Sequence, residues 1–139
     1  MKSIVVRKAY GHRIALRFFA VLFLAAIAVI AACFRQLAWI MLLMCSPVLA
    51  GMIGMLLYYE TWQVIFEQDG VRKKVFGLSG KVHGYSQIRD TVTRRSYTEQ
   101  GIIRVIFTDN SSIKFRLEDE NAEKAKKRIL SYHSIREIG

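Results

Sequence analysis

Apolar residues run almost without a break from Phe18 to Tyr59, and Arg35 is the only charged residue of this stretch. A helix needs roughly 20 residues to cross the ~30 Å hydrocarbon core of a bilayer, and about 17 is the lower limit. The run has 17 residues before the polar pair Arg35-Gln36 and 23 after it. Such a pair suits a turn at the membrane surface. The pattern therefore predicts a membrane α-helical hairpin made of two transmembrane helices, 18–34 and 37–59.

Beyond the second apolar run, hydrophobic and polar residues alternate, which is the period of a half-buried β-strand. Asp69-Gly70 between two alternating runs is a strong β-hairpin signal. Near residue 118 the period becomes helical, with acidic residues at the expected helix start. Residues 60–139 are thus expected to form a small α+β domain with one C-terminal helix, packed through Ala122, Ala125, Ile129 and Tyr132. Its six expected antiparallel strands are 62–66, 71–77, 81–86, 91–97, 102–108 and 113–117.

The charge is distributed unevenly along the chain. Residues 1–36 carry six Lys/Arg and no acid, whereas residues 60–139 carry fifteen Lys/Arg and eleven Asp/Glu. Basic residues gather on the cytoplasmic side of membrane spans, and the turn between the spans offers only Arg35. We therefore expect a multi-pass protein of the cell (inner) membrane with both termini cytoplasmic. The expected segments are a basic cytoplasmic arm (1–17), the helical hairpin (18–59) and a cytoplasmic domain (60–139).

The arm could be a short strand, an interfacial helix or the ordinary basic flank of a first span, and we favour the flank. The residues before Cys33 also fit a lipoprotein signal, but a second span follows directly, which favours a transmembrane helix. Cys33 and Cys45 are expected at depths differing by roughly 10 Å, too far apart for a disulfide. The residues expected to anchor the hairpin at the membrane interfaces are Arg17, Arg35, Tyr58, Tyr59 and Trp62.

Small residues recur every four positions in the second span. Ser46, Ala50 and Gly54 form one smooth stripe, and such stripes let helices approach closely. The first span is the expected partner, although the same stripe could serve a dimer or another membrane protein. Pro47 is expected to kink the helix. Because neither span contains Asp, Glu, Lys or His, the sequence argues against a transporter or a pump.

A series of β-hairpins closed by one helix and preceded by a two-span anchor resembles the bacterial pleckstrin-homology-like membrane proteins, including the YcxB-like group. The likeness covers most of residues 60–135. It implies a split antiparallel β-barrel plugged by the C-terminal helix, and it implies little about function. That fold usually has seven strands, so one strand would be short, missing or supplied by the arm. The segments that carry the resemblance are 62–66, 69–71, Gly84-Tyr85-Ser86-Gln87-Ile88, 103–107, Asp109, 113–115 and 121–125.

No catalytic, metal-binding or cofactor-binding motif stands out in the sequence. The three histidines are separated from cysteines and carboxylates in the chain, and no serine has a nucleophile context. We therefore expect neither an enzyme nor a metal or cofactor. Basic residues remain as candidate contacts for lipid or another ligand, and nucleic acid is not expected because the domain carries only +4. These candidates are Arg72, Lys74, Arg94, Arg95, Lys114 and Arg116.

Two functions follow as hypotheses. In the first, a non-enzymatic integral membrane protein presents a cytoplasmic domain that binds a protein or peptide, or that contacts anionic lipid headgroups, with or without a specific pocket. In the second, the chain is an accessory subunit of a membrane transporter or enzyme and associates through its second transmembrane helix. A homo-oligomer is also compatible with the sequence.

Overall fold

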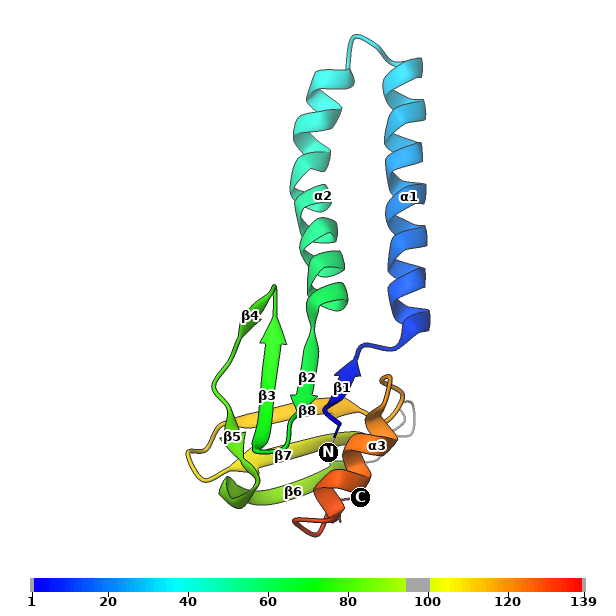
Figure 1. Cartoon of the computed structure of the whole chain (residues 1–139). Helices are drawn as coiled ribbons and strands as arrows, with labels where there is room; N and C mark the ends of the chain where they lie inside the picture. The colour runs from blue at the N-terminus through cyan, green and yellow to red at the C-terminus, as the bar shows by residue number, and fades with distance from the viewer. Residues whose placement is uncertain (1, 95–100, 139) are drawn as a thin grey trace. The chain divides into compact units, whose positions relative to one another are not determined.

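The structure, a computed structural model, describes residues 2–94 and 101–138. It divides into two compact units: two long helices form residues 10–60, and a domain of strands with one short helix combines residues 1–9 with 61–139. Figure 1 shows both units, each of which is described by itself. The N-terminal segment therefore belongs to the domain, whereas the sequence-based division treated residues 1–17 as a separate arm.

The two long helices are α1 (Tyr10–Cys33) and α2 (Ala38–Thr61), with 24 residues each. Both are long and apolar enough to cross a membrane, and none of their residues is buried. At 1.5 Å per residue each is about 36 Å long, so each exceeds the hydrocarbon thickness by about one turn. The extra length of α1 lies at its start, because the helix begins eight residues before Phe18. Its first turns carry polar residues, including Arg13 and Arg17.

The domain contains a sheet of five strands with the order β1-β2-β3-β4 and with β5 also paired to β3. Arg7 at the end of β1 pairs with Gln63 at the start of β2, so the residues just before α1 lie beside those just after α2. Residues 4–7 of the N-terminal arm thus form a strand and residues 10–17 begin α1, so the preference for an ordinary flank was wrong for residues 4–7. The strands are β1 (Ile4–Arg7), β2 (Gln63–Phe66), β3 (Gly70–Val75), β4 (Leu78–Ser79) and β5 (His83–Gly84).

The second sheet has the order β8-β7-β6-β9 and is mixed, because β9 runs parallel to β6. Its strands run across those of the first sheet in Figure 1, and the two sheets are not closed into a barrel. Alternation in the sequence correctly predicted the buried residues Ile103, Val105 and Phe107 of β7. The strands are β6 (Ile88–Arg94), β7 (Ile102–Phe107), β8 (Ser112–Arg116) and β9 (Arg136–Ile138).

Helix α3 (Ala122–Leu130) closes the domain through its small, buried face. Its Arg128 donates hydrogen bonds to the carbonyls of Lys2 and Phe66, at 2.9 and 3.0 Å, and so ties β1 to β2. Ala122, Ala125 and Ile129 are buried as expected. Tyr132 lies beyond the helix and is half exposed, because its ring stacks on Tyr85 instead of entering the core.

Two expected strands have a different form in the structure. The expected strand 81–86 contains only the two-residue β5, and a 3₁₀ turn (Tyr85–Gln87) follows it, fastened by a bond from the Gly84 amide to the Gln87 side chain. The expected strand 91–97 begins earlier, at Ile88. Its last residues, 95–97, lie outside the described part of the chain. Gly70 is required where β3 passes β5, because a Cβ there would lie 2.2 Å from the His83 carbonyl oxygen.

Candidate functional site

Cations gather on one face of the four-stranded sheet. Thr93, Ile103 and Phe115 are buried, so residues one position away on each strand face outward. The register then aligns two rows across the sheet: Arg94 opposite Ile102 opposite Arg116, and Val92 opposite Arg104 opposite Lys114. We call the outward cations of these rows the basic face, which consists of Arg94, Arg104, Lys114 and Arg116.

Within this face, two like charges are direct neighbours. Arg104 of β7 is the cross-strand partner of Lys114 of β8, and both side chains are exposed. Opposite residues of an antiparallel pair have Cβ atoms roughly 5 Å apart, and like charges at this distance are destabilising. Such a pair is relieved by an anion placed against it, so this position marks the basic face as a candidate binding surface.

A small hollow of about 160 Å³ lies at the end of the basic face and is lined by Lys8, Ile102, Lys114, Phe115 and Arg116. The Lys8 amine lies 4.1 Å from the centre of the Trp62 ring, over its face. Burial lowers the pKa of this amine below its ordinary 10.5, and the nearby charges of Arg116 and Lys73 lower it further, against the attraction of Asp119. The hollow therefore concentrates positive charge where apolar atoms exclude part of the water.

Two carboxylates balance this charge only in part. Buried Asp119 accepts backbone bonds from Ala9 (3.2 Å) and Arg116 (2.9 Å), which fixes the start of the chain against the turn after β8. The Arg116 guanidinium also donates to Glu118 at 3.2 Å. Three cations, Lys8, Lys114 and Arg116, line the hollow against these two acids, so its formal charge balance is positive.

The six basic residues predicted from sequence do not form one cluster. Arg94, Lys114 and Arg116 share the basic face. Arg72 lies on β3, where its guanidinium pairs with Glu67 at 2.7 Å and donates to Ser79 at 3.0 Å, so this charge is already neutralised within the sheet. Lys74 lies two residues further along the same strand. Arg95 lies outside the described residues.

Four of the five predicted interface anchors, Arg17, Arg35, Tyr58 and Tyr59, lie on the long helices or between them. Arg17 pairs with Glu60 at 2.6 Å, across the open ends of the two helices, and Tyr58 contacts Tyr59 edge to face at 5.8 Å. Arg35 is exposed between the helices. Trp62, expected at a membrane interface, is only 2% exposed, because it packs in the domain under Lys8.

The small-residue stripe of α2 is exposed over part of its length. Ser46 and Ala50 are exposed, whereas Gly54 is half-buried. The Ser46 hydroxyl is bonded to the Leu43 carbonyl of its own helix at 3.0 Å. The expectation that α1 covers this stripe therefore fails at Ser46 and Ala50. The half-buried residues of α2 are Ala38, Met41, Cys45, Leu49, Met52, Gly54, Leu56, Tyr58, Tyr59, Glu60 and Thr61.

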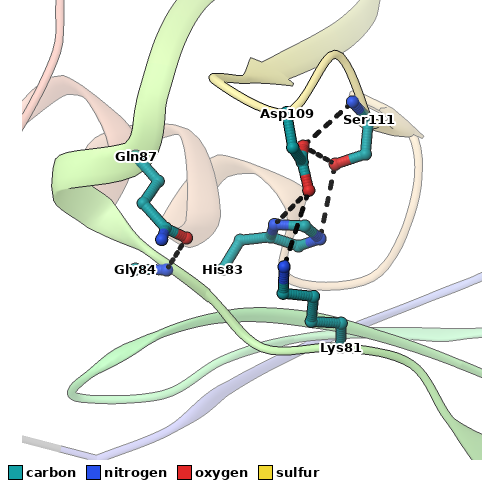
Figure 2. A network of polar contacts seen from close by, with 6 residues as sticks. All are labelled: Lys81, His83, Gly84, Gln87, Asp109 and Ser111. Carbon is teal, nitrogen blue, oxygen red and sulfur yellow. Dashed lines mark hydrogen bonds and ion pairs between the residues drawn. The ribbon is translucent and has the colours of Figure 1, made fainter.

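A second polar cluster brings together a histidine, a serine and an aspartate (Figure 2). His83 is buried against Phe107, with ring centres 4.2 Å apart. Its Nδ1 lies 3.7 Å from an Asp109 oxygen and its Nε2 lies 3.4 Å from the Ser111 hydroxyl. No local pattern predicts this contact, because the residues come from β5 and from the turn between β7 and β8.

The connectivity of this cluster differs from that of a catalytic triad. In a triad the histidine takes the serine proton and the aspartate holds the histidine. Here Asp109 accepts bonds from both the amide and the hydroxyl of Ser111, at 3.0 and 2.5 Å, so the serine proton points to the carboxylate. Those two bonds, followed by the charges of His83 and Lys81, lower the pKa of Asp109. The cluster acts as a clasp that holds the turn to β5.

Searches of protein-family models, curated proteins and solved structures found no match to this chain. Within the described residues, no group of three or more His, Cys, Asp or Glu could hold a metal ion. The basic face and its hollow are therefore the arrangement with the clearest binding chemistry. Sequence analysis missed Arg104, although alternation in β7 would have placed it outward, and missed Lys8, whose position depends on pairing with a distant segment.

Proposed function

We propose that the chain is a non-enzymatic integral membrane protein whose domain contacts anionic lipid headgroups through the basic face. The observation that carries this proposal is the like-charged pair Arg104 and Lys114 beside the hollow of Lys8. Lys8 precedes α1 by two residues and Trp62 follows α2 by one. If these helices span the bilayer, chain connectivity keeps the hollow within about 10 Å of the headgroups. Each basic residue near such a surface contributes about 1 kcal/mol.

The membrane topology in this proposal has support from the sheet. Strand β1 precedes the first helix and pairs with β2, which follows the second. Two segments of one sheet must lie on the same side of a membrane, so the two helices would cross it down and back. The excess of basic residues at the open end favours the cytoplasmic side of the cell membrane. The apolar helix surfaces, such as Leu43 and Met44, at 74% and 75% exposure, are compatible with lipid and unfavourable in water.

We further propose that the domain is related to the pleckstrin-homology-like fold. Two sheets of mainly antiparallel strands, followed by one helix that packs on their shared core, support this relation. Residues 60–139 contain eight strands and the N-terminal segment adds β1, so the strand count exceeds the seven usual for that fold. The open arrangement of the two sheets and the parallel strand β9 depart from the expected split barrel.

The headgroup proposal is tested with the full chain in nanodiscs, either purely zwitterionic or containing an anionic phospholipid. Anionic lipid should slow backbone hydrogen exchange in β7 and β8, and rising salt should reverse the effect, because the Debye length falls from about 10 Å at 0.1 M to about 3 Å at 1 M. The double variant Arg104→Gln/Lys114→Gln should lose this protection. Lys124→Gln/Lys127→Gln removes the same charge from exposed positions of α3 and should retain it. Equal exchange in both lipids would refute headgroup contact and leave a protein or peptide as the ligand.

The exposure of Ser46 and Ala50 favours a second candidate function, in which the chain is an accessory subunit of a membrane complex or a homo-oligomer. Helices associate in lipid through small residues that let their backbones approach. Replacing Ser46, Ala50 and Gly54 by leucine should then abolish a co-purifying partner or a crosslinked dimer. Leucine at Ile40, Val48 and Ile53, which are also exposed on α2, is the matched control. A partner that stays bound to both variants would exclude this association surface.

A further inference from the structure

The β-hairpin of β3 and β4 ends in an exposed apolar tip. Val75 pairs with Leu78, so Phe76 and Gly77 form a two-residue turn. Phe76 is 54% exposed and Leu78 is 77% exposed. Val82, just beyond the hairpin, adds a further side chain that is 45% exposed. Three large apolar side chains therefore meet the surroundings within seven residues, in a domain whose other large hydrophobic side chains are mostly buried.

The turn carries an aromatic residue where backbone conformation disfavours one. Phe76 has φ +53° and Gly77 has φ +78°, the positive values that a type I′ turn requires at both central positions. Asn, Asp or Gly is the usual first residue of such a turn, and a bulky residue with positive φ is an outlier. Phenylalanine is therefore unfavourable for the turn itself. The hairpin nevertheless carries Phe76 at its turn and Leu78 beside it, both exposed, and so presents apolar surface at its end.

The tip is fixed beside the end of the second long helix. The Phe76 amide donates a hydrogen bond of 2.9 Å to the side-chain oxygen of Thr61, the last residue of α2. Thr61 belongs to the same compact unit as the hairpin, so this contact is internal to the domain. The tip therefore lies next to Thr61, the residue at which α2 ends and the domain begins.

Basic residues flank the apolar tip. Lys73 and Lys74 precede it on β3, with Lys73 exposed, and Lys81 follows β4, where its amine lies 3.9 Å from an Asp109 oxygen. Apolar side chains bordered by lysines are the composition of segments that lie in the interface of a membrane, where the rings enter the headgroup region and the amines stay at the phosphates. If α2 spans the bilayer, its end lies at the membrane surface. A binding site for a protein partner would not need to lie next to that surface.

We propose that the β3–β4 hairpin tip inserts Phe76 and Leu78 into the interfacial region of the leaflet at which α2 ends. The hairpin is then a third membrane contact beside the two helices and limits how the domain can move on its tether. This inference rests on the proposed function in one respect, since it requires α2 to span the bilayer. It does not require anionic lipid, because the contact is apolar.

The test uses a nitroxide label on Leu78→Cys in the full chain, with Cys33 and Cys45 replaced by alanine, in zwitterionic nanodiscs without any other protein. Collision rates with oxygen, which concentrates in lipid, are compared with those of a water-soluble nickel chelate. Two further labels serve as references: Val48→Cys on exposed α2 and Thr108→Cys on the exposed β7–β8 turn. We expect an oxygen-to-nickel ratio at Leu78→Cys several-fold above that at Thr108→Cys and below that at Val48→Cys.

The outcomes separate the two proposals. A ratio at Leu78→Cys equal to that at Thr108→Cys, with a lipid value at Val48→Cys, would overturn the insertion and keep the anchor. An aqueous value at Val48→Cys would overturn the anchor as well. Phe76→Asn supplies a variant that suits the turn: it should keep the domain folded while lowering the ratio at Leu78→Cys several-fold. If Phe76→Asn leaves that ratio unchanged, Phe76 does not take part in the contact.

Discussion

At the scale of single residues, Lys8 shows how much of the candidate site depends on long-range pairing. Its amine contacts Trp62, and its charge meets those of Arg116, Lys73 and Asp119, all of which come from other parts of the chain. Alternation identifies which strand residues point outward, and this placed Lys114 and Arg116 together correctly. No local pattern marks Lys8, because its position depends on β1 joining a sheet more than fifty residues away.

The lowered pKa of Lys8 predicts a pH-dependent stability. Between this value and 10.5 the unfolded chain holds the proton and the folded chain releases it, so the free energy of unfolding contributed by Lys8 rises as pH increases through this window. Lys8→Met should therefore be more stable than the parent at neutral pH, and the difference should shrink as pH approaches 10.5. Urea unfolding of both proteins in detergent, followed by Trp62 fluorescence, measures this difference. A gap that is constant with pH would show that the pKa of Lys8 is not lowered.

Val6 tests whether the N-terminal strand belongs to the core. Its side chain is 0% exposed. Val6→Ala removes two methyl groups from the core. It should lower the free energy of unfolding by about 2 kcal/mol, since each group contributes ~0.8 kcal/mol and the cavity adds a further cost. The neighbouring Val5 is half exposed, so Val5→Ala should cost clearly less in the same denaturation experiment. Equal effects of the two substitutions would mean that Val6 is not buried.

At the scale of elements, the sequence predicted what local periodicity determines. The pattern predicted β7 and β8 to within about one residue, because alternation is local, and it predicted a helix after them without fixing its ends. It left β1 as one of three alternatives and missed β9, because three or four residues hold too little pattern and their pairing is decided by tertiary contacts. It also expected α1 to cover Ser46 and Ala50, which are exposed, since the spacing of small residues does not tell which face a neighbouring helix covers.

Strand β1 is expected to be essential to the domain, whereas β9 is not. Besides its ladder with β2, β1 accepts a bond from Asn121 at the Val5 carbonyl and exchanges backbone bonds with Glu120 through Arg7. Deleting residues 2–7 should make the domain sensitive to protease in the full chain. Deleting 136–138, all exposed, should leave it resistant. Comparable resistance after both deletions would contradict the role of β1. A fragment of residues 60–139 lacks this strand and is unsuitable for binding studies.

At the scale of the whole molecule, one domain is assembled from both ends of a helical hairpin. Segments 1–9 and 61–139 form a single compact unit, and the 51 residues between them form the other. The sequence analysis predicted two long apolar helices and a small domain of strands with one C-terminal helix, which the structure contains. It could not show that the domain is discontinuous, because strand pairing across two intervening helices leaves no local signal. A domain built this way is complete only once both helices have been made.

The most direct test of the account is the side of the membrane on which each end of the hairpin lies. In a chain with Cys33 and Cys45 replaced by alanine, single cysteines are placed at Ser3, Ser134 and Gln36 and treated with a membrane-impermeant maleimide in intact cells. Gln36→Cys should be labelled from outside, whereas Ser3→Cys and Ser134→Cys should be labelled only after the cells are opened. Labelling of positions 3 and 134 on opposite sides would contradict the pairing of β1 with β2 and the two-span anchor together.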